Sequence, residues 1–379
     1  MLLLIVIYLS FCGIGLPYSL FGAAWPSMYE SMAVPDSWLG IVSMILMFSN
    51  VIANTYSGKL LKYFETGKIT CICVLLIGAS IAGVALSGTF VFLCIFAVLI
   101  GLGMGFIDAS LNSFVAIHFK AKHMNWLHCF WGVGAAASPV VFSYGLTRSG
   151  SWRPGYFVLS GFLFGVALIS VSALPKWKKA TTAAEQVKEL IKIKFWDIFR
   201  LKGLKLSLVV FFCYCAVEMN VGVWGSSYLV MVKNVSPELA ARWISLFFLG
   251  MTLERLACGF LPINLENHKF IRIGCAVFAL GIITMFLSSG DIAYMGGFFL
   301  MGIGYGPVFP CLMFDTPKHF GEEYSPTAVG LQLASANVSC SFTPFLFGTA
   351  TAYFGYGFFP LFLGIWLTAT ITTIEVLNR

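Results

Sequence analysis

A few ionisable side chains stand inside long apolar segments of this sequence, and their chemistry suggests proton exchange. Asp108 lies in the segment 91–118, with Asn112 four residues further on and therefore on the same face of a helix. Glu218 lies about halfway along the segment 205–231. An acid in hydrocarbon costs about 2.5–3.5 kcal/mol on insertion scales, so such residues are candidates for function. We expect Asp108 and Glu218 to bind and release a proton; the alternative for each is a hydrogen bond between helices.

A second group of polar residues begins the segment 125–147. Asn125, His128 and Gly132 share one face of a helix, and Trp131 stands next to Gly132. These side chains suit a hydroxyl-rich solute, because Asn125 and His128 offer hydrogen bonds and Trp131 offers a flat ring for stacking. The structural alternatives are a hydrogen bond within the protein for His128 and a lipid-facing position for Trp131.

Other polar and aromatic residues extend both sets of candidates. The further candidates for the substrate-binding surface are Tyr18, Trp224, Gln332 and Asn337. The candidates for a gate or latch near the segment ends are Glu65, Glu254, Arg255 and Asp315. For Arg255, which adjoins Glu254 inside an apolar segment, direct binding of the substrate is the alternative to a gating role.

The elements that must position these residues are membrane-spanning helices. The 379 residues are 59% hydrophobic, 16% aromatic and only 10% charged, and the mean hydropathy is +0.89. Soluble chains average about 25% charged residues, so this composition excludes a soluble protein. The net charge of +7 comes from basic residues in short loops, a pattern that sets membrane orientation and does not indicate nucleic-acid binding.

Twelve apolar segments are long enough to cross a membrane as helices. They cover residues 2–25, 38–58, 69–88, 91–118, 125–147, 154–174, 205–231, 239–262, 270–289, 292–314, 327–353 and 356–376. The sequence therefore predicts an all-α membrane protein with a six-helix bundle at 1–175, a basic cytoplasmic linker at 176–204 and a second six-helix bundle at 205–379. Within the linker, residues 183–199 suit an amphipathic helix at the membrane surface.

The basic residues also predict how the chain is oriented. Most of the 23 Lys and Arg residues lie on the side of the predicted membrane that holds the linker and both termini. Those expected in loops on the other side are Arg148, Arg153, Lys233 and Arg242. Because positively charged loops stay inside, we expect both termini in the cytoplasm and the protein in the plasma membrane, the inner membrane if the cell is bacterial.

The two halves of the chain share an internal repeat. Gly101, Gly103 and Gly105 recur as Gly302, Gly304 and Gly306, and the same spacing carries His118 and Phe119 onto His319 and Phe320. On this basis Gln332 stands close to the position equivalent to His128. The repeat predicts two pseudo-symmetric bundles, with a solute site between them and transport by rocking one bundle against the other.

Several motifs carry a resemblance to a known family. They are Asp108–Asn112, Asn125–Ala135, Gly302–Pro310, Thr316–Pro317 and Gly330–Gln332. With them the sequence resembles the fucose permease-like (fucose–galactose–glucose:proton symporter) branch of the major facilitator superfamily. The resemblance implies the twelve-helix major facilitator fold and proton-coupled uptake of a small neutral solute, typically a monosaccharide. It also implies a proton-coupling role for Asp108 and sugar contacts for His128 and Trp131.

The sequence departs from that family at two places. The family often has a second acid in its first helix, but the residues around Tyr18 include none. The loop after the second segment, residues 58–68, is a degenerate form of the superfamily motif, with Lys62 in place of an Asp and Glu65 in place of a Gly. Proton coupling then rests on Asp108 alone, rests on Asp108 together with Glu218, or is absent. The gate is expected to form through Glu65 or through the pair Glu254 and Arg255 in the eighth segment.

Two other functions compete with sugar symport. The run Gly134–Pro139 partly matches a proton-linked antiporter signature, which would make the chain an exporter of amphipathic compounds. A sensor or scaffold without transport is the third possibility. Motifs of soluble enzymes and of nucleotide-driven pumps are missing, so we expect no enzyme activity, cofactor or metal. The expected partners are a sugar-like solute, protons and the lipid bilayer, with no nucleic acid, and the expected state is a monomer.

Overall fold

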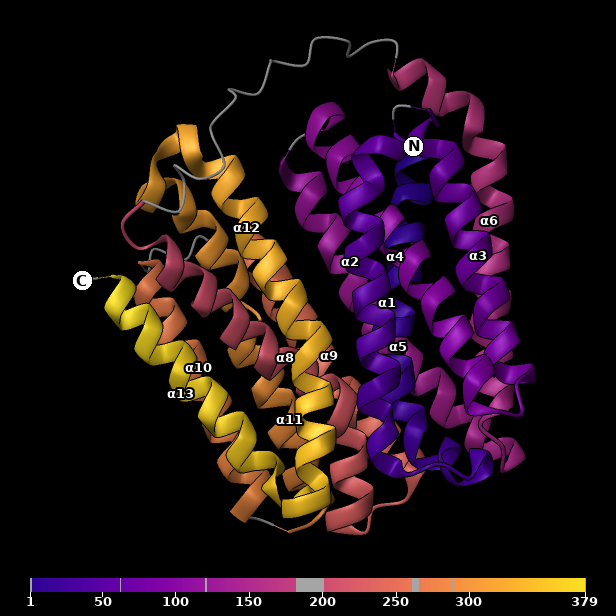
Figure 1. Ribbon diagram of the computed structural model, residues 1–379, viewed down its shortest axis with the longest axis vertical. Coiled ribbons are helices and arrows are strands. Elements are labelled where there is room, and N and C mark those ends of the chain that lie inside the picture. The colour runs from indigo at the N-terminus through magenta and orange to yellow at the C-terminus, as the bar shows by residue number, and fades with distance from the viewer. Residues whose placement is uncertain are drawn as a thin grey trace.

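The computed structural model describes residues 2–61, 63–119, 121–181, 201–260, 266–287 and 289–378, which form two bundles of long helices (Figure 1). The first bundle contains α1 (Leu2–Met28), α2 (Leu39–Leu60), α3 (Thr66–Leu86), α4 (Phe90–His118), α5 (Ala121–Ser149) and α6 (Arg153–Thr181). The second contains α8 (Leu204–Lys233), α9 (Pro237–Phe260), α10 (Asn267–Leu287), α11 (Asp291–Tyr305), α12 (Val308–Phe354) and α13 (Phe359–Leu377). Short 3-10 turns stand at Glu30–Met32, Asp36–Trp38 and Tyr356–Phe358. The prediction of an all-α fold with two six-helix bundles is confirmed.

The tenth and eleventh predicted segments differ most from the observed helices. The tenth was predicted as one helix over 292–314, but α11 ends at Tyr305 and α12 begins at Val308. Pro307 between them has no N–H to donate, so the helix is interrupted there. The helix α12 then bends at Gly321, whose φ of 81° is left-handed. The part before Gly321 completes the tenth crossing, and the part after it forms the eleventh.

Ten of the described helices are long and apolar enough to cross a membrane by length and composition. The helix α9 and the later part of α12 fall outside this set. The helix α9 carries Glu238, Arg242, Glu254 and Arg255, which lower its hydropathy. It nevertheless packs extensively against α5 and α11, within the membrane-spanning assembly. Charged residues thus concentrate on α9, a helix of the second bundle that packs against α5 of the first bundle.

The internal repeat is visible in the helix contacts. A Cβ atom at Gly101 of α4 would overlap the carbonyl oxygen of Leu46 in α2. A Cβ atom at Gly302 of α11 would overlap the carbonyl oxygen of Phe247 in α9 in the same way. Leu46 and Phe247 are themselves separated by the repeat spacing. The glycines therefore serve one purpose in both halves, which is to let two helix backbones touch.

The observed helix ends differ slightly from the predicted boundaries of the linker, 176–204. The helix α6 continues to Thr181, inside the predicted linker, and α8 begins at Leu204. Residues 182–200, with the amphipathic helix predicted at 183–199, lie outside the described residues.

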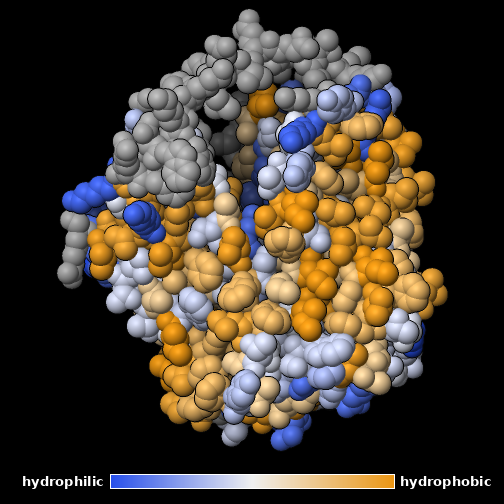
Figure 2. Space-filling model, in the orientation of Figure 1, coloured by the Kyte–Doolittle hydropathy of each residue, from blue (hydrophilic) through white to orange (hydrophobic). Residues whose placement is uncertain are grey.

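The two bundles touch at the end of the molecule opposite the N-terminus. A Cβ at Gly22 of α1 would overlap the carbonyl oxygen of Gly222 in α8, and one at Gly40 of α2 would lie 2.8 Å from the Cα of Phe345 in α12. Ser143 of α5 donates a hydrogen bond to the carbonyl oxygen of Glu238 in α9, at 2.7 Å. Figure 1 shows the bundles converging at this lower end and separating toward the upper end. Figure 2 shows a hollow between them in the upper half, with hydrophilic residues in its depth. We call it the central hollow.

We expect Gly40→Leu to open the closed end. The leucine side chain has no room against Phe345, so α2 and α12 must move apart. Spin labels at the exposed residues Gly88 and Asp291 should report a longer distance between the bundles than in the wild type. The control is Gly58→Leu on the same helix, where a Cβ meets nothing within 4 Å. An unchanged distance in Gly40→Leu would show that this contact does not hold the end closed.

Candidate functional site

Five side chains from both bundles meet between the bundles, and we call them the central group. Tyr18 of α1, His128 and Trp131 of α5, Glu218 of α8 and Arg255 of α9 make up this group. The rings of Tyr18 and Trp131 meet edge to face at 4.9 Å between centroids. The guanidinium carbon of Arg255 lies 5.9 Å from the centroid of Trp131, so the group joins the two bundles. Aromatic and hydrogen-bonding side chains of both bundles therefore converge at one place between the bundles.

Arg255 is the electrostatic centre of this group. It interacts with Glu218 of α8, with Tyr214 of the same helix and with its neighbour Glu254. Its Nε–H donates to the carbonyl oxygen of Gly306, at 3.5 Å, where α11 ends. Within the described chain it forms no ion pair with a carboxylate. The guanidinium is thus held in place by a backbone oxygen, and part of it stays accessible.

His128 faces the central hollow. Its side chain is exposed although it stands in electrostatic range of Arg255 in the other bundle. Its ring packs edge to face on Phe11 of α1, with 5.5 Å between centroids. One turn further on, a Cβ at Gly132 would overlap the side-chain oxygen of Thr252, so α5 and α9 touch there. The side chain of Asn125, predicted on the same face, lies outside the described residues.

Glu218 and Trp224 occupy different surroundings on α8. Glu218 is 7% exposed and is in hydrogen-bond range of Tyr214, one turn earlier on the same helix. It also interacts electrostatically with Tyr18 of the first bundle. Trp224 is fully buried, and its Nε1–H donates to the carbonyl oxygen of Pro344 at 3.0 Å. Glu218 therefore belongs to the central group, whereas Trp224 packs within the second bundle near the closed end.

Asp108 lies in a separate polar cluster between α2 and α4. The Nδ2 of Asn112 donates to Oδ1 of Asp108 at 2.8 Å, as their helical spacing predicts. Asn54 of α2 is also in hydrogen-bond range of Asp108, and it donates to Asn50 at 2.8 Å. These bonds join two helices of the first bundle. The structure thus brings Asp108 and Asn112 together, and no hydrogen bond among the described residues links this pair to the second bundle.

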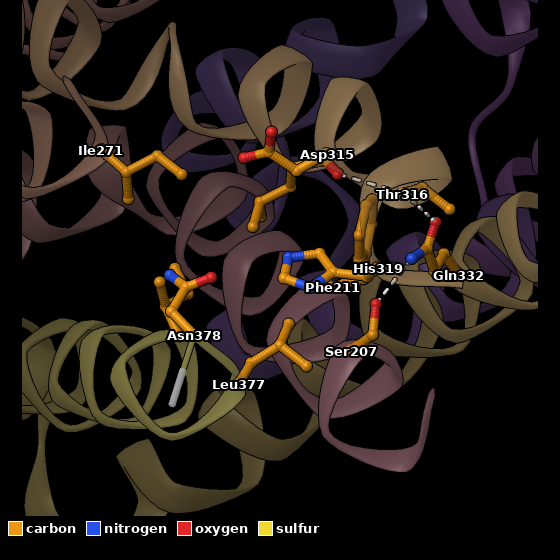
Figure 3. Close-up of a pocket in the computed structure, with 11 residues that line it drawn as sticks. Ser207, Phe211, Ile271, Asp315, Thr316, His319, Gln332, Leu377 and Asn378 are labelled. Atoms are coloured by element: carbon orange, nitrogen blue, oxygen red, sulfur yellow. Dashed lines mark hydrogen bonds between the residues drawn. The ribbon is translucent and has the colours of Figure 1, made fainter. Parts of the chain in front are cut away.

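Gln332 is part of a buried network inside the second bundle, where it lines a pocket together with Ser207 and Thr316 (Figure 3). It is 1% exposed. Thr316 donates to its Oε1 at 3.0 Å, and its Nε2 donates to Ser207 at 2.6 Å. The contact with a substrate that was predicted for Gln332 is therefore not available in this conformation. The repeat spacing also relates Gln332 to Trp131 and not to His128.

The network at Gln332 predicts a structural effect. Gln332→Leu leaves the hydroxyls of Thr316 and Ser207 buried without this partner, which should cost about 2 kcal/mol. The melting temperature of the purified protein should fall, whereas the affinity for the solute should not change. Val338→Leu, at an exposed position of the same helix, serves as the control. A loss of solute affinity at an unchanged melting temperature would instead place Gln332 in the binding site.

The predicted gating residues belong to three separate places. Glu254 is 9% exposed and accepts a hydrogen bond from Sγ of Cys258 at 2.6 Å, beside the break between α11 and α12. Asp315 accepts bonds from Asn267 and Lys318, both at 2.8 Å, and so ties α10 to α12. Glu65 precedes α3 without capping it through its side chain. Their role as gates stays a prediction, and Lys62 lies outside the described residues.

Asn337 and Cys340 lie one helical turn apart on α12. Asn337 is partly buried on α12, and the Sγ of Cys340, one turn later, lies 4.0 Å from the hydroxyl of Tyr18. Cys340 and Tyr214 were not among the predicted site residues. Tyr214 could have been found from the sequence, because it stands one helical turn before Glu218.

The run that partly matched an antiporter signature packs α5 on α1. A Cβ at Gly134 would overlap the carbonyl oxygen of Cys12. Ser138 donates to the carbonyl oxygen of Leu16 at 2.9 Å. Small residues at these positions are therefore explained by the close contact of two helices in the first bundle.

Solved structures with this arrangement are membrane transporters. The crystal structure of the nucleoside transporter NupG matches with a TM-score of 0.80 and 13% sequence identity, over 100% of this chain and 98% of that one. The crystal structure of a D-xylose–proton symporter matches with a TM-score of 0.77 and 14% identity, over 98% and 96% of the two chains. At such identities the likeness establishes the fold alone.

The sequence is also similar to proteins that are named as sugar or sugar phosphate transporters. It is 24% identical to the glucose/mannose transporter GlcP of Bacillus subtilis, over 90% of this chain and 86% of that protein. It is 23% identical to a probable hexose phosphate transport protein of Chlamydia trachomatis, over 94% and 86%. The family model described as Major Facilitator Superfamily matches residues 7–344. The chain therefore belongs to the Major Facilitator Superfamily of membrane transporters.

Proposed function

We propose that this transporter takes up a monosaccharide together with protons and binds it at the central group. The observation that carries the proposal is the convergence of Tyr18, His128, Trp131 and Arg255 from both bundles around an accessible hollow. A flat indole beside several hydrogen-bonding groups suits a sugar, which has apolar ring faces and a rim of hydroxyls. The relative named as a glucose/mannose transporter supports the choice of a sugar.

The way the two bundles meet supports transport by alternating access. The hollow opens at the end where the N-terminus lies, and glycine contacts close the opposite end. With the termini in the cytoplasm, as the basic loops predict, this is an inward-facing state. The units that rock are residues 1–175 and 205–379, joined by the linker 176–204. In the outward-facing state the contacts at Gly22 and Gly40 would separate. We place the protein in the plasma membrane as a monomer.

Two acids are proposed to couple transport to protons. Glu218 lies in the central group, where its charge acts on Arg255 and Tyr18. Proton binding there changes the charge that the solute meets. Asp108 lies between α2 and α4, in a cluster with Asn112 and Asn54, where protonation changes the hydrogen bonds between these helices. Glu218 thus acts at the site, and Asp108 acts on the packing of the first bundle.

Uptake into liposomes tests the function. The purified full chain is reconstituted, and labelled glucose, mannose, galactose and fucose are offered with an inward proton gradient. We expect at least one hexose to accumulate above its external concentration, and a protonophore to abolish the accumulation. Equilibration without accumulation would contradict coupling. Extrusion of an amphipathic dye without uptake of any sugar would favour the exporter instead.

A further inference from the structure

Arg255 offers two hydrogen-bonding groups to the central hollow. Its Nε–H is engaged by the carbonyl oxygen of Gly306, which fixes the plane of the guanidinium. Its two terminal nitrogens have no hydrogen-bond or ion-pair partner within the described chain. A planar guanidinium with two such donors has the geometry that binds a carboxylate or a phosphate through two parallel hydrogen bonds.

Within the described chain, neither acid near Arg255 forms an ion pair with it. The carboxylate of Glu254 lies against Gly306, and its Oε1 accepts from Cys258. Glu218 acts on Arg255 at a distance and is in hydrogen-bond range of Tyr214. His128 of the first bundle, which is in electrostatic range of Arg255, adds no negative charge. A partly buried cation without an anionic partner is unfavourable, so an incoming anion gains from binding to Arg255.

The neighbours of Arg255 provide a place for a sugar ring beside it. The guanidinium carbon is 5.9 Å from the centroid of Trp131, and Tyr18 stands against the same indole. A pyranose packed on the indole of Trp131 would lie beside this guanidinium. An acidic substituent can therefore reach Arg255 while the ring stays on the indole.

We propose that the transported sugar is an anion, a sugar acid or a sugar phosphate, whose acidic group binds Arg255. This inference rests on the proposed function and narrows its solute class from the neutral monosaccharide that the family resemblance implies. An anionic solute also explains the acid at position 218. When Glu218 carries a proton, its side chain no longer competes with the acidic group of the solute for the guanidinium of Arg255. One proton carried with a sugar carboxylate transfers no net charge.

The test is binding to the purified full chain in detergent. Glucose, glucuronate and glucose 6-phosphate are titrated by calorimetry against the wild type, Arg255→Gln and Arg255→Lys. The matched control is Arg242→Gln, which removes an exposed arginine from the other end of the same helix. We expect one of the two acids to bind the wild type more tightly than glucose does, and the better acid identifies the acidic group. Arg255→Gln should weaken its binding by about 30-fold, and Arg242→Gln should not.

The lysine variant keeps the test decisive if Arg255→Gln does not fold. Arg255→Lys retains the charge but loses the paired donors, so binding of the acid should weaken much more than binding of glucose does. Binding of glucose as tight as that of both acids, or acid binding that is insensitive to both substitutions, would overturn the inference. If glucose binds as tightly as both acids do, the proposed sugar transport would still stand. Failure of both acids to bind would overturn the inference, whereas the proposed sugar transport is decided by the uptake of the four hexoses.

Discussion

Glu218→Gln is expected to abolish proton-driven accumulation while exchange of labelled for unlabelled solute continues. A gradient of one pH unit supplies about 1.4 kcal/mol, which supports about a tenfold accumulation ratio if one proton moves with each solute molecule. Glutamine cannot carry that proton, so the ratio should fall to about one. It keeps the shape of Glu218 and a hydrogen bond to Tyr214, so the hollow should still bind solute. The measurement is uptake and counterflow in the same liposome preparation.

Two substitutions place this result in context. Asp108→Asn makes the same chemical change in the cluster between α2 and α4, and we expect it to reduce accumulation as well. Asp291→Asn, at an exposed position of α11 outside both sites, is the control and should behave as the wild type. Full accumulation by Glu218→Gln together with none by Asp108→Asn would move coupling to α4 and contradict the role given to Glu218.

Gly302→Val is expected to prevent stable folding. The first atom of any side chain there overlaps the carbonyl oxygen of Phe247, and both atoms belong to helices packed along their length. The backbones of α9 and α11 must separate, which removes packing and helix contacts at a cost of about 3 kcal/mol or more. The monodisperse fraction in detergent and the melting temperature should both fall sharply.

The repeat makes this prediction specific. Gly101→Val should have a similar effect, because Gly101 meets Leu46 as Gly302 meets Phe247. Gly296→Val, on the same helix as Gly302, should be tolerated because a Cβ there meets nothing within 4 Å. Equal losses at Gly296 and Gly302 would show that valine disturbs α11 itself and not its contact with α9.

The helices of the fold could be predicted because each crossing needs a long apolar segment. The segment 91–118 differs from α4 by one residue, at its start. The glycines of the repeat could be predicted for a similar reason, since close backbone packing leaves glycine at fixed positions in both halves. The break between α11 and α12 was missed because Pro307 stands in an otherwise apolar run, where hydropathy alone does not register it.

The site could be predicted only in part. Helical spacing placed Asn112 beside Asp108, since both lie on one helix. Helical spacing does not show whether the polar face of a helix turns toward the hollow or toward the helices of its own bundle. For this reason Gln332 and Trp224, which hydrogen-bond within the second bundle, were predicted to contact the solute. The meeting of Arg255 with Trp131 depends on how two bundles dock, and local sequence carries little information about that.

The most direct test of proton-coupled uptake is to record protons when solute is added without an imposed gradient. Liposomes that contain the transporter and an internal pH dye are given the sugar that binds best. Proton coupling through Glu218 predicts that the lumen of wild-type liposomes acidifies as the sugar enters. Liposomes with the Glu218→Gln variant should take up the sugar with no change of pH. Entry of the sugar into wild-type liposomes without acidification would contradict it.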